Sequence, residues 1–292
     1  RYAFKNATIS QFLEVMEEQC ACNLDEFRSI WIDSTAYPYQ RCLDYLNSHS
    51  NSIRLFGEIQ KELTVSPDSN EFIVKKYWGN INDPELRKRI ILRYGNSLSE
   101  EYLAAISAEG LPEVRQAVAV SLLKASQKTR ATFESLLNDA SYITKENALY
   151  KLWLSYPDKR EQYLETTREI IGLPNKSFRL TWLLLASLTP NYGQPATRAK
   201  WQAELRGYTA GHYSFEVRQN AFVILHDVLG LNDSNLKDLG QACVHHVWQF
   251  RNFARNLMVE LVEDQDYRIR IQALLDQLGA KEQAYLKTIL GV

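Results

Sequence analysis

The sequence is poor in residues that interrupt helices and in residues that cross-link small domains. Its 292 residues include 12 glycines, 8 prolines and 4 cysteines. Glycine and proline fall between segments with helical spacing of apolar residues, and the alternation typical of strands is nearly missing. Four cysteines are too few for a disulfide scaffold. Because Cys20 and Cys22 lie two positions apart on an expected helix, we expect buried or free thiols rather than a bridge or a metal site.

Excess charge and long apolar runs are missing as well. The 34 basic and 35 acidic residues leave a net charge of −1, which argues against a broad attraction to nucleic acid or to an anionic membrane. No run approaches the roughly 20 apolar residues of a membrane span, so we expect no transmembrane segment. The chain opens without an initiator methionine or an apolar signal segment, and we therefore expect a fragment or a processed chain.

Complete catalytic motifs are also missing. A zinc hydrolase of the usual kind needs His-Glu-x-x-His on one helix, and the five histidines do not provide this spacing. A helix would point the adjacent His245 and His246 about 100° apart, and we expect a half-buried pair near Trp248. His226, beside Asp227, is expected to be an ordinary helix residue. Without a Gly-x-Ser-x-Gly elbow or a glycine-rich phosphate loop, the sequence indicates a binding or structural module rather than a complete enzyme.

What the sequence does contain is a weak repeat of helix starts. Each start carries a basic residue, at positions 87, 115, 145, 179, 218 and 251, and these are 28, 30, 34, 39 and 33 residues apart. Such spacing fits two helices with their turns per unit, each pair packing on the pairs before and after it. We predict an all-α fold of stacked antiparallel helix pairs, a HEAT or armadillo-like α-α superhelix. An irregular helical bundle is the alternative.

The segment before this repeat gives local predictions. Ser10 is a candidate N-cap for a helix that begins near Ile9. A longer helix is expected over Leu43 to Leu63, interrupted around residues 47–52. The run Pro67-Asp68-Ser69-Asn70 predicts a turn.

The first 45 residues carry a more specific pattern. A helical segment with Glu17-Glu18 leads into Asn23-Leu24-Asp25-Glu26-Phe27, then Trp31-Ile32-Asp33 and Tyr37-Pro38. This succession resembles the end of the catalytic domain in the zinc aminopeptidase family that includes aminopeptidase N, a family of gluzincin peptidases. The sequence departs from the family pattern at three points: Gln11 stands where Asp is usual, Cys20-Ala21-Cys22 replaces a Ser-Gly link, and Arg28 replaces a second Phe.

The later sequence resembles the helical C-terminal domain of bacterial members of this family, through Asp139 to Ile143 with Ala148-Leu149. The resemblance implies two domains: residues 1–45 as terminal helices of a thermolysin-like catalytic domain and residues 46–292 as a HEAT-like helical domain. No β-sandwich, which some members have between these parts, is evident.

The resemblance also implies what the chain does. The family's zinc ligands, general-base Glu and transition-state Tyr lie upstream of the matched segment, so no catalytic residue and no metal ligand maps onto this chain. Zinc is implied only for the parent enzyme, with ligands upstream of residue 1. The chain would wall the active-site chamber, contact the upstream catalytic domain of the same protein and help to bind peptide substrate. The chain is expected not to be catalytic by itself, and its location, cytoplasmic or periplasmic in a bacterium, stays open.

Arg251, Arg255 and His245 are the candidate substrate-binding residues. Arg251 and Arg255 are four residues apart and share a helix face, from which they could reach the far carboxylate of a peptide. An ion pair or carbonyl contact inside the repeat is the alternative role for both. The alternative function is a non-catalytic HEAT-like scaffold that binds a partner protein. A nucleic-acid-binding repeat is disfavoured by the neutral charge.

Overall fold

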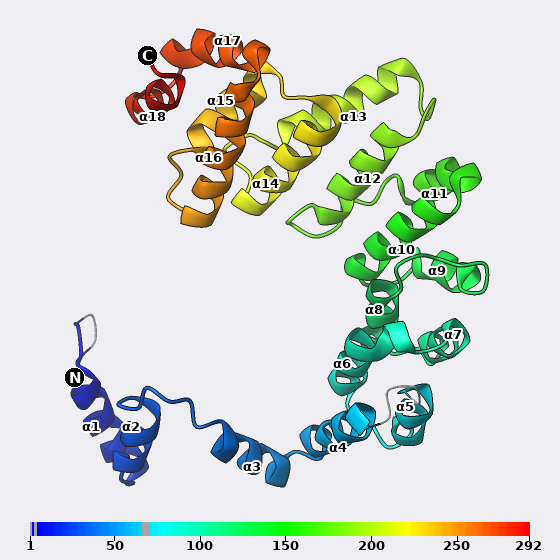
Figure 1. The fold of residues 1–292 in the computed structure, drawn as a ribbon, viewed down its shortest axis with the longest axis vertical. Helices are drawn as coiled ribbons and strands as arrows, with labels where there is room; N and C mark the ends of the chain where they lie inside the picture. The colour runs from blue at the N-terminus through cyan, green and yellow to red at the C-terminus, as the bar shows by residue number, and fades with distance from the viewer. Residues whose placement is uncertain (1, 3–4, 66–69) are drawn as a thin grey trace. The chain divides into compact units, whose positions relative to one another are not determined.

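The computed structural model describes residue 2 and residues 5–65 and 70–292, and these residues fold into helices joined by turns (Figure 1). No strand occurs in these ranges, which confirms the predicted all-α fold class. The chain packs as two compact units, Arg1–Leu86 (unit 1) and Arg87–Val292 (unit 2).

Unit 1 contains short helices and the first residues of α6. The helices are α1 Ile9–Cys20, α2 Asp25–Trp31, α3 Tyr39–His49, α4 Asn51–Val65, α5 Asn70–Trp78 and α6 Pro84–Tyr94. The helix expected over residues 43–63 is two helices, which separate at the extended Ser50 inside the expected interruption. The boundary expected after residue 45 falls inside α3. The turn predicted at residues 67–70 lies outside the described residues, apart from Asn70, which begins α5.

The start of α1 differs from the prediction by two residues. Thr8, not Ser10, is the N-cap: its hydroxyl accepts a hydrogen bond from the Gln11 backbone N–H at 3.2 Å. The Gln11 side chain in turn accepts from the Thr8 N–H at 2.9 Å. This reciprocal pair is a capping box, and it gives Gln11 a local role at the position where the family pattern has Asp.

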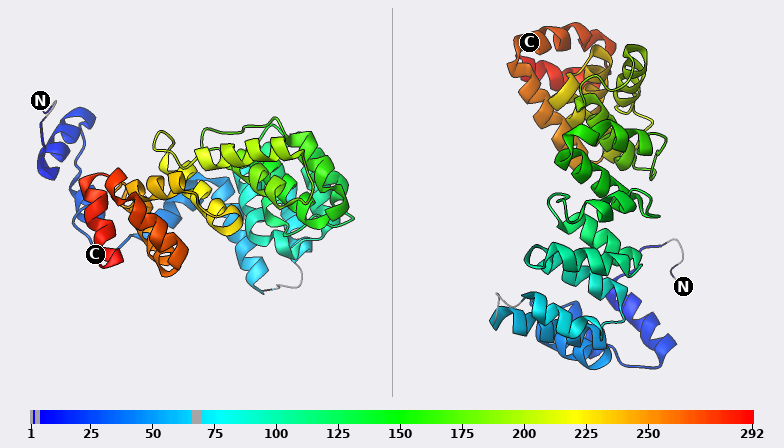
Figure 2. Two further views of the ribbon diagram at one scale, coloured as in Figure 1. Left: turned by 90° about the horizontal axis from the view of Figure 1, so that it is seen from above. Right: turned by 90° about the vertical axis from the view of Figure 1, so that its right-hand side faces the viewer.

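Unit 2 is a succession of helix pairs. After α6 come α7 Glu100–Ala108, α8 Pro112–Ser121, α9 Arg130–Leu136, α10 Tyr142–Ser155, α11 Arg160–Thr167, α12 Ser177–Leu188, α13 Pro195–Gly207, α14 Phe215–Ile224, α15 Asp233–Ala242, α16 Trp248–Glu263, α17 Gln265–Leu274 and α18 Ala280–Leu290. The views of Figures 1 and 2 agree that the pairs follow one another along unit 2 in sequence order.

The helices of unit 2 form two layers. The even-numbered helices contact each other in turn: α8 packs on α10, α10 on α12, α12 on α14 and α14 on α16. We call these five helices the even layer, and they lie along the inner side of the arc that unit 2 makes in Figure 1. The odd-numbered helices cover the other side, with α9 and α11 against α10, α13 against α12 and α15 against α16. This is the predicted stack of helix pairs.

The repeat found in the sequence corresponds to the starts of α6 and of the even layer. Pro84 and Pro112 are the first residues of α6 and α8, where the missing N–H of proline costs nothing. Ser141 caps α10 by accepting from the Thr144 N–H at 3.3 Å. Helices α12 and α14 start at Ser177 and Phe215 without a side-chain cap: their N-caps are the left-handed Lys176 and Ser214, and neither side chain makes a capping hydrogen bond.

The core of unit 2 lies between the two layers and is rich in aromatic residues. Trp182, on α12, is completely buried, and its indole N–H donates to the Leu164 carbonyl of α11 at 3.0 Å. Its ring packs edge-on against Trp201 of α13 at 5.0 Å between centroids, and Trp201 stacks on Tyr192. These contacts fix α12 against both of its odd-numbered neighbours.

Candidate functional site

The arginines at the repeated helix starts bind backbone carbonyls of the preceding turns. Arg115 donates to the Gly110 carbonyl at 2.5 Å, and Arg179 donates to the Arg168 carbonyl at 2.8 Å. Arg218 donates to the Thr209 carbonyl at 2.8 Å. The carbonyls at helix ends lack intrahelical partners, so these guanidinium groups satisfy acceptors that each repeat leaves open. The repeated basic residue therefore holds neighbouring helices together.

Arg251 and Arg255, two of the candidate substrate-binding residues, make the same kind of contact. Arg251 donates to the His245 carbonyl at 3.1 Å, and Arg255 donates to the Cys243 carbonyl at 2.8 Å. The Arg255 guanidinium also lies over the Tyr285 ring of α18, 4.5 Å from its centroid. Both arginines thus have a place in the packing between α15, α16 and α18. Their role toward a peptide carboxylate stays a prediction.

His245, the third candidate, does not lie on a helix. It precedes α16 with His246, and the two rings are 4.2 Å apart between centroids. Its Nδ1 accepts from the Val247 backbone N–H at 3.2 Å, which leaves the proton of the neutral ring on Nε2. Burial lowers the pKa of His245, and His246 and Arg218 lower it further. His245 is half-buried as expected, whereas His246 is exposed.

The exposed side of the even layer carries a row of apolar side chains. One such residue lies near the C-terminal end of each even-numbered helix, and each is between 41% and 47% exposed: Val120, Leu154, Leu188, Val223 and Val259. We call this row the even-layer stripe. One member lies on each of five helices that pack on one another in turn. Exposed apolar residues on successive repeats make the even layer a candidate binding face.

The first two helices of unit 1 expose an apolar face of their own. On α1, Ile9, Phe12 and Met16 lie one turn apart on one side and are 54%, 55% and 42% exposed. On α2, Phe27 and Trp31 are also exposed. Leu13 is the buried residue of α1, and none of the described residues of α2 and α3 is buried. We call these five exposed residues the α1–α2 face.

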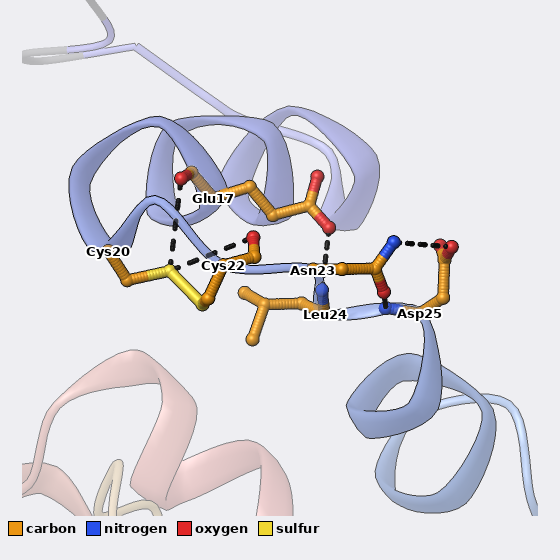
Figure 3. The surroundings of a disulfide bond; sticks show 6 residues. All are labelled: Glu17, Cys20, Cys22, Asn23, Leu24 and Asp25. Atoms are coloured by element: carbon orange, nitrogen blue, oxygen red, sulfur yellow. Dashed lines mark hydrogen bonds between the residues drawn. A yellow bond between two sulfur atoms is a disulfide. The ribbon is translucent and has the colours of Figure 1, made fainter.

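Cys20 and Cys22 form a disulfide, so the expectation of buried or free thiols is wrong for this pair (Figure 3). The prediction kept both cysteines on one helix, but α1 ends at Cys20 and Ala21 adopts a left-handed conformation with φ 51°. The chain therefore turns back and brings the two Cα atoms to 5.2 Å. Glu17 fastens the same turn, because its carboxylate accepts from the Leu24 N–H at 2.7 Å. Cys42 and Cys243 are free thiols.

An apolar hollow of about 380 Å³ lies in unit 1 between α2 and α3. Its walls are Trp31, Tyr37, Arg41, Cys42, Tyr45 and Leu46. Trp31 and Tyr37 pack edge to face with their centroids 6.2 Å apart. Trp31 thus belongs both to this hollow and to the α1–α2 face.

The described part of the chain holds no candidate metal site. Within residues 2, 5–65 and 70–292, no three or more His, Cys, Asp or Glu side chains come together as a metal site. Over the same ranges, no helix is both long and apolar enough to cross a membrane. No protein-family model, curated protein or solved structure matches the chain.

Proposed function

We propose that this chain is the C-terminal helical part of a zinc-dependent aminopeptidase. In this proposal the catalytic domain and its metal ligands lie upstream, and α1 and α2 are the last helices of that domain. Unit 2 walls the chamber in which the peptide is cleaved. The even layer faces the peptide and helps to bind it, and the chain has no peptidase activity by itself.

The α1–α2 face is the observation that carries the proposal. Half-burial of a large apolar side chain stabilises a fold by roughly 1 kcal/mol, so the five residues of this face represent roughly 5 kcal/mol of unused stabilisation. Helices α2 and α3 bury no residue in the described structure, which is unusual for helices that fold on their own. A covering domain would use this surface, and the resemblance of residues 1–45 to the end of a catalytic domain supports a catalytic domain in that role.

A comparison of the full-length protein with the 292-residue chain tests the proposal. The full-length protein should release the N-terminal residue from an unblocked aminoacyl peptide, and chelation of zinc should abolish this activity. The 292-residue chain should be inactive with or without added zinc. Peptidase activity in the chain alone, or none in the zinc-loaded full-length protein, would overturn the proposal.

The α1–α2 face can be tested by one substitution. Phe12→Ser should lower the unfolding free energy of the full-length protein by about 2 kcal/mol, because a covered phenylalanine loses its apolar contacts. In the 292-residue chain the same change should cost less than about 0.5 kcal/mol, because Phe12 is more than half exposed. Ile269→Ser, at an equally exposed position of α17, is the matched control and should cost little in both proteins. Equal effects of Phe12→Ser in the two proteins would count against a covering domain.

The even-layer stripe favours one alternative, a non-catalytic scaffold whose even layer holds a partner protein. Exposed apolar residues on five successive helices suit a protein partner as well as a peptide substrate. The sequence upstream of Arg1 would distinguish the peptidase from the non-catalytic scaffold. An intact His-Glu-x-x-His with a downstream Glu favours the peptidase, and a degenerate version favours the scaffold.

A further inference from the structure

A groove on the exposed side of the even layer lies between α14 and α16. It has a volume of about 220 Å³ and is lined by Val223, His226, Asp227, Phe253, Asn256, Leu257 and Glu260. Its floor and one wall are apolar, since Leu257 is buried and Phe253 half-buried. Small-molecule pockets usually measure about 300–1,000 Å³, so this groove has room for one side chain rather than for a cofactor.

A π turn carries His226 and Asp227, two of the polar residues that line the groove. Helix α14 runs directly into this turn, Leu225–Leu229, which ends at Gly230 with a φ of 69°. His226 therefore does not occupy the ordinary helix position expected from the sequence. Its Nδ1 lies 3.1 Å from Asp227 Oδ1, and its Nε2 lies 3.6 Å from Glu260 Oε1 of α16.

The arginines of these two helices are not available to the groove. They are Arg218, Arg251 and Arg255; all are buried or half-buried and bind backbone carbonyls. The two carboxylates of the groove, Asp227 and Glu260, are 62% and 63% exposed. His226 contacts both of them and is the one basic side chain among the groove-lining residues. The groove thus presents two exposed carboxylates beside an apolar wall, with no lysine or arginine in its lining.

We propose that this groove binds a lysine or arginine side chain of a peptide. The aliphatic stem would lie along Val223 and Phe253, and the cationic end would lie beside His226, against the exposed carboxylates of Asp227 and Glu260. Lysine and arginine suit such a site because they bury their stems on apolar surface and keep the charge in water. An anionic group would meet both carboxylates and is excluded.

The neighbouring surface defines the rest of the peptide. Val223 belongs to the even-layer stripe, and Leu188 and Val259 expose further apolar surface on α12 and α16. A peptide that crosses the even layer would therefore place apolar residues on either side of its cationic residue. The inference rests on the proposed function, in which the even layer faces bound peptide, and it adds a substrate class: peptides with a basic residue flanked by apolar ones.

Binding of a labelled peptide to the 292-residue chain tests the site directly. The probe is a fluorescein-labelled heptapeptide with lysine at its centre between leucines, and its match has norleucine, which keeps the stem and removes the charge. Fluorescence anisotropy should show the lysine peptide binding about tenfold more tightly at low salt, the combined effect of two exposed ion pairs. The difference should shrink at high salt, because both carboxylates are exposed.

Two double variants locate the effect. Asp227→Asn with Glu260→Gln should weaken binding of the lysine peptide about tenfold and leave the norleucine peptide unchanged. Asp158→Asn with Glu161→Gln removes the same charge from exposed positions at α11 and should change neither. Equal affinities for the two peptides on the unmodified chain overturn the inference without any variant. So does an equal loss in the two double variants, which would indicate a general charge effect.

The outcome is separable from that of the proposed function. Zinc-dependent activity of the full-length protein with no lysine preference on this chain would reject the groove and leave the peptidase standing. A lysine preference on this chain with no activity of the full-length protein would keep the groove and reject the peptidase, and would favour the scaffold.

Discussion

Lys151, on α10, is a buried cation that makes a testable contribution to the pH dependence of stability. It is only 6% exposed, and its ammonium group donates to the carbonyls of Ala119 and Val120, the latter at 2.9 Å. Both carbonyls belong to the last turn of α8, where they lack partners within the helix. Lys151 thus links two neighbouring helices of the even layer. The perturbation is Lys151→Met, which keeps the length and most of the volume of the side chain and removes the charge.

The magnitude follows from the pKa. Burial lowers the pKa of Lys151 to about 8, whereas an unfolded lysine titrates near 10.4. Between these values the unfolded chain binds more protons than the folded chain, so the lysine makes stability rise with pH. Below pH 8 the penalty for the buried charge is about 3 kcal/mol, and it falls by about 2 kcal/mol between pH 7.5 and pH 9.5. The C-terminal end of α8 attracts a cation, which opposes the lowering of the Lys151 pKa. This attraction can only make the change of about 2 kcal/mol smaller.

Cys243 has the opposite effect on the pH dependence of stability, so the experiment must compare the native chain with single variants. Burial raises the pKa of this thiol to about 12, although Arg255 opposes the rise, and an unfolded cysteine titrates near 8.5. The folded chain then binds more protons above pH 8.5, so Cys243 lowers stability as pH rises. The total stability of the native chain can therefore stay nearly flat, and only the difference between native and variant chains isolates Lys151.

Urea unfolding at several pH values between 7.5 and 9.5 provides that difference. The unfolding free energy of the native chain minus that of Lys151→Met should increase by about 2 kcal/mol across this range. The same comparison for Cys243→Ala should change with the opposite sign. A difference that is constant with pH for Lys151→Met would refute the lowered pKa, and would indicate that the two carbonyls keep the lysine as basic as in water.

Three further predictions concern the packing of unit 2 and the turn after α1. Gly193 has a φ of 76°, and an added Cβ would come within 2.7 Å of the Trp201 ring, so Gly193→Ala should cost about 2–4 kcal/mol in urea unfolding; a loss below about 1 kcal/mol would contradict this. Arg179 holds the Glu204 carboxylate with two hydrogen bonds of 2.8 and 2.6 Å, so Arg179→Met should cost about 3–5 kcal/mol, and Glu204→Gln in the same chain should recover part of the loss. The Cys20–Cys22 bridge closes a loop of only three residues, so its reduction should lower stability by no more than about 1.6 kcal/mol in thermal unfolding with and without dithiothreitol.

The helical stack is predictable from the sequence because its signals are local. Proline or a small polar residue lies at the starts of α8, α10, α12 and α14, and a basic residue follows within the first turns. The structure shows why the basic residue recurs: Arg115, Arg179 and Arg218 each bind a carbonyl of the preceding turn. The period drifts because the connections between helices differ in length, and the arginines tolerate this drift since they reach the nearest open carbonyl.

The missed features depend on the path of the backbone. Nothing in the spacing of Cys20 and Cys22 shows that α1 ends between them, and the left-handed Ala21 is what brings them together. Likewise, the π turn at Leu225–Leu229 shifts His226 and Asp227 toward α16, so a helical projection puts them in the wrong place. The residues that build the repeat can therefore be predicted from the sequence, whereas the groove between α14 and α16 cannot.

This difference bears on where binding residues should be sought in the chain. The basic residues draw attention in the sequence because they recur, but at Arg115, Arg179 and Arg218 they cap carbonyls that the preceding turns leave open. Arg251 and Arg255 share that task with Arg218, and all three donate to the backbone. The exposed positions of the even layer are not needed to cap carbonyls, so their residue types can differ from one repeat to the next. A site for one particular ligand, such as the groove at Asp227 and Glu260, is therefore expected at positions that do not repeat.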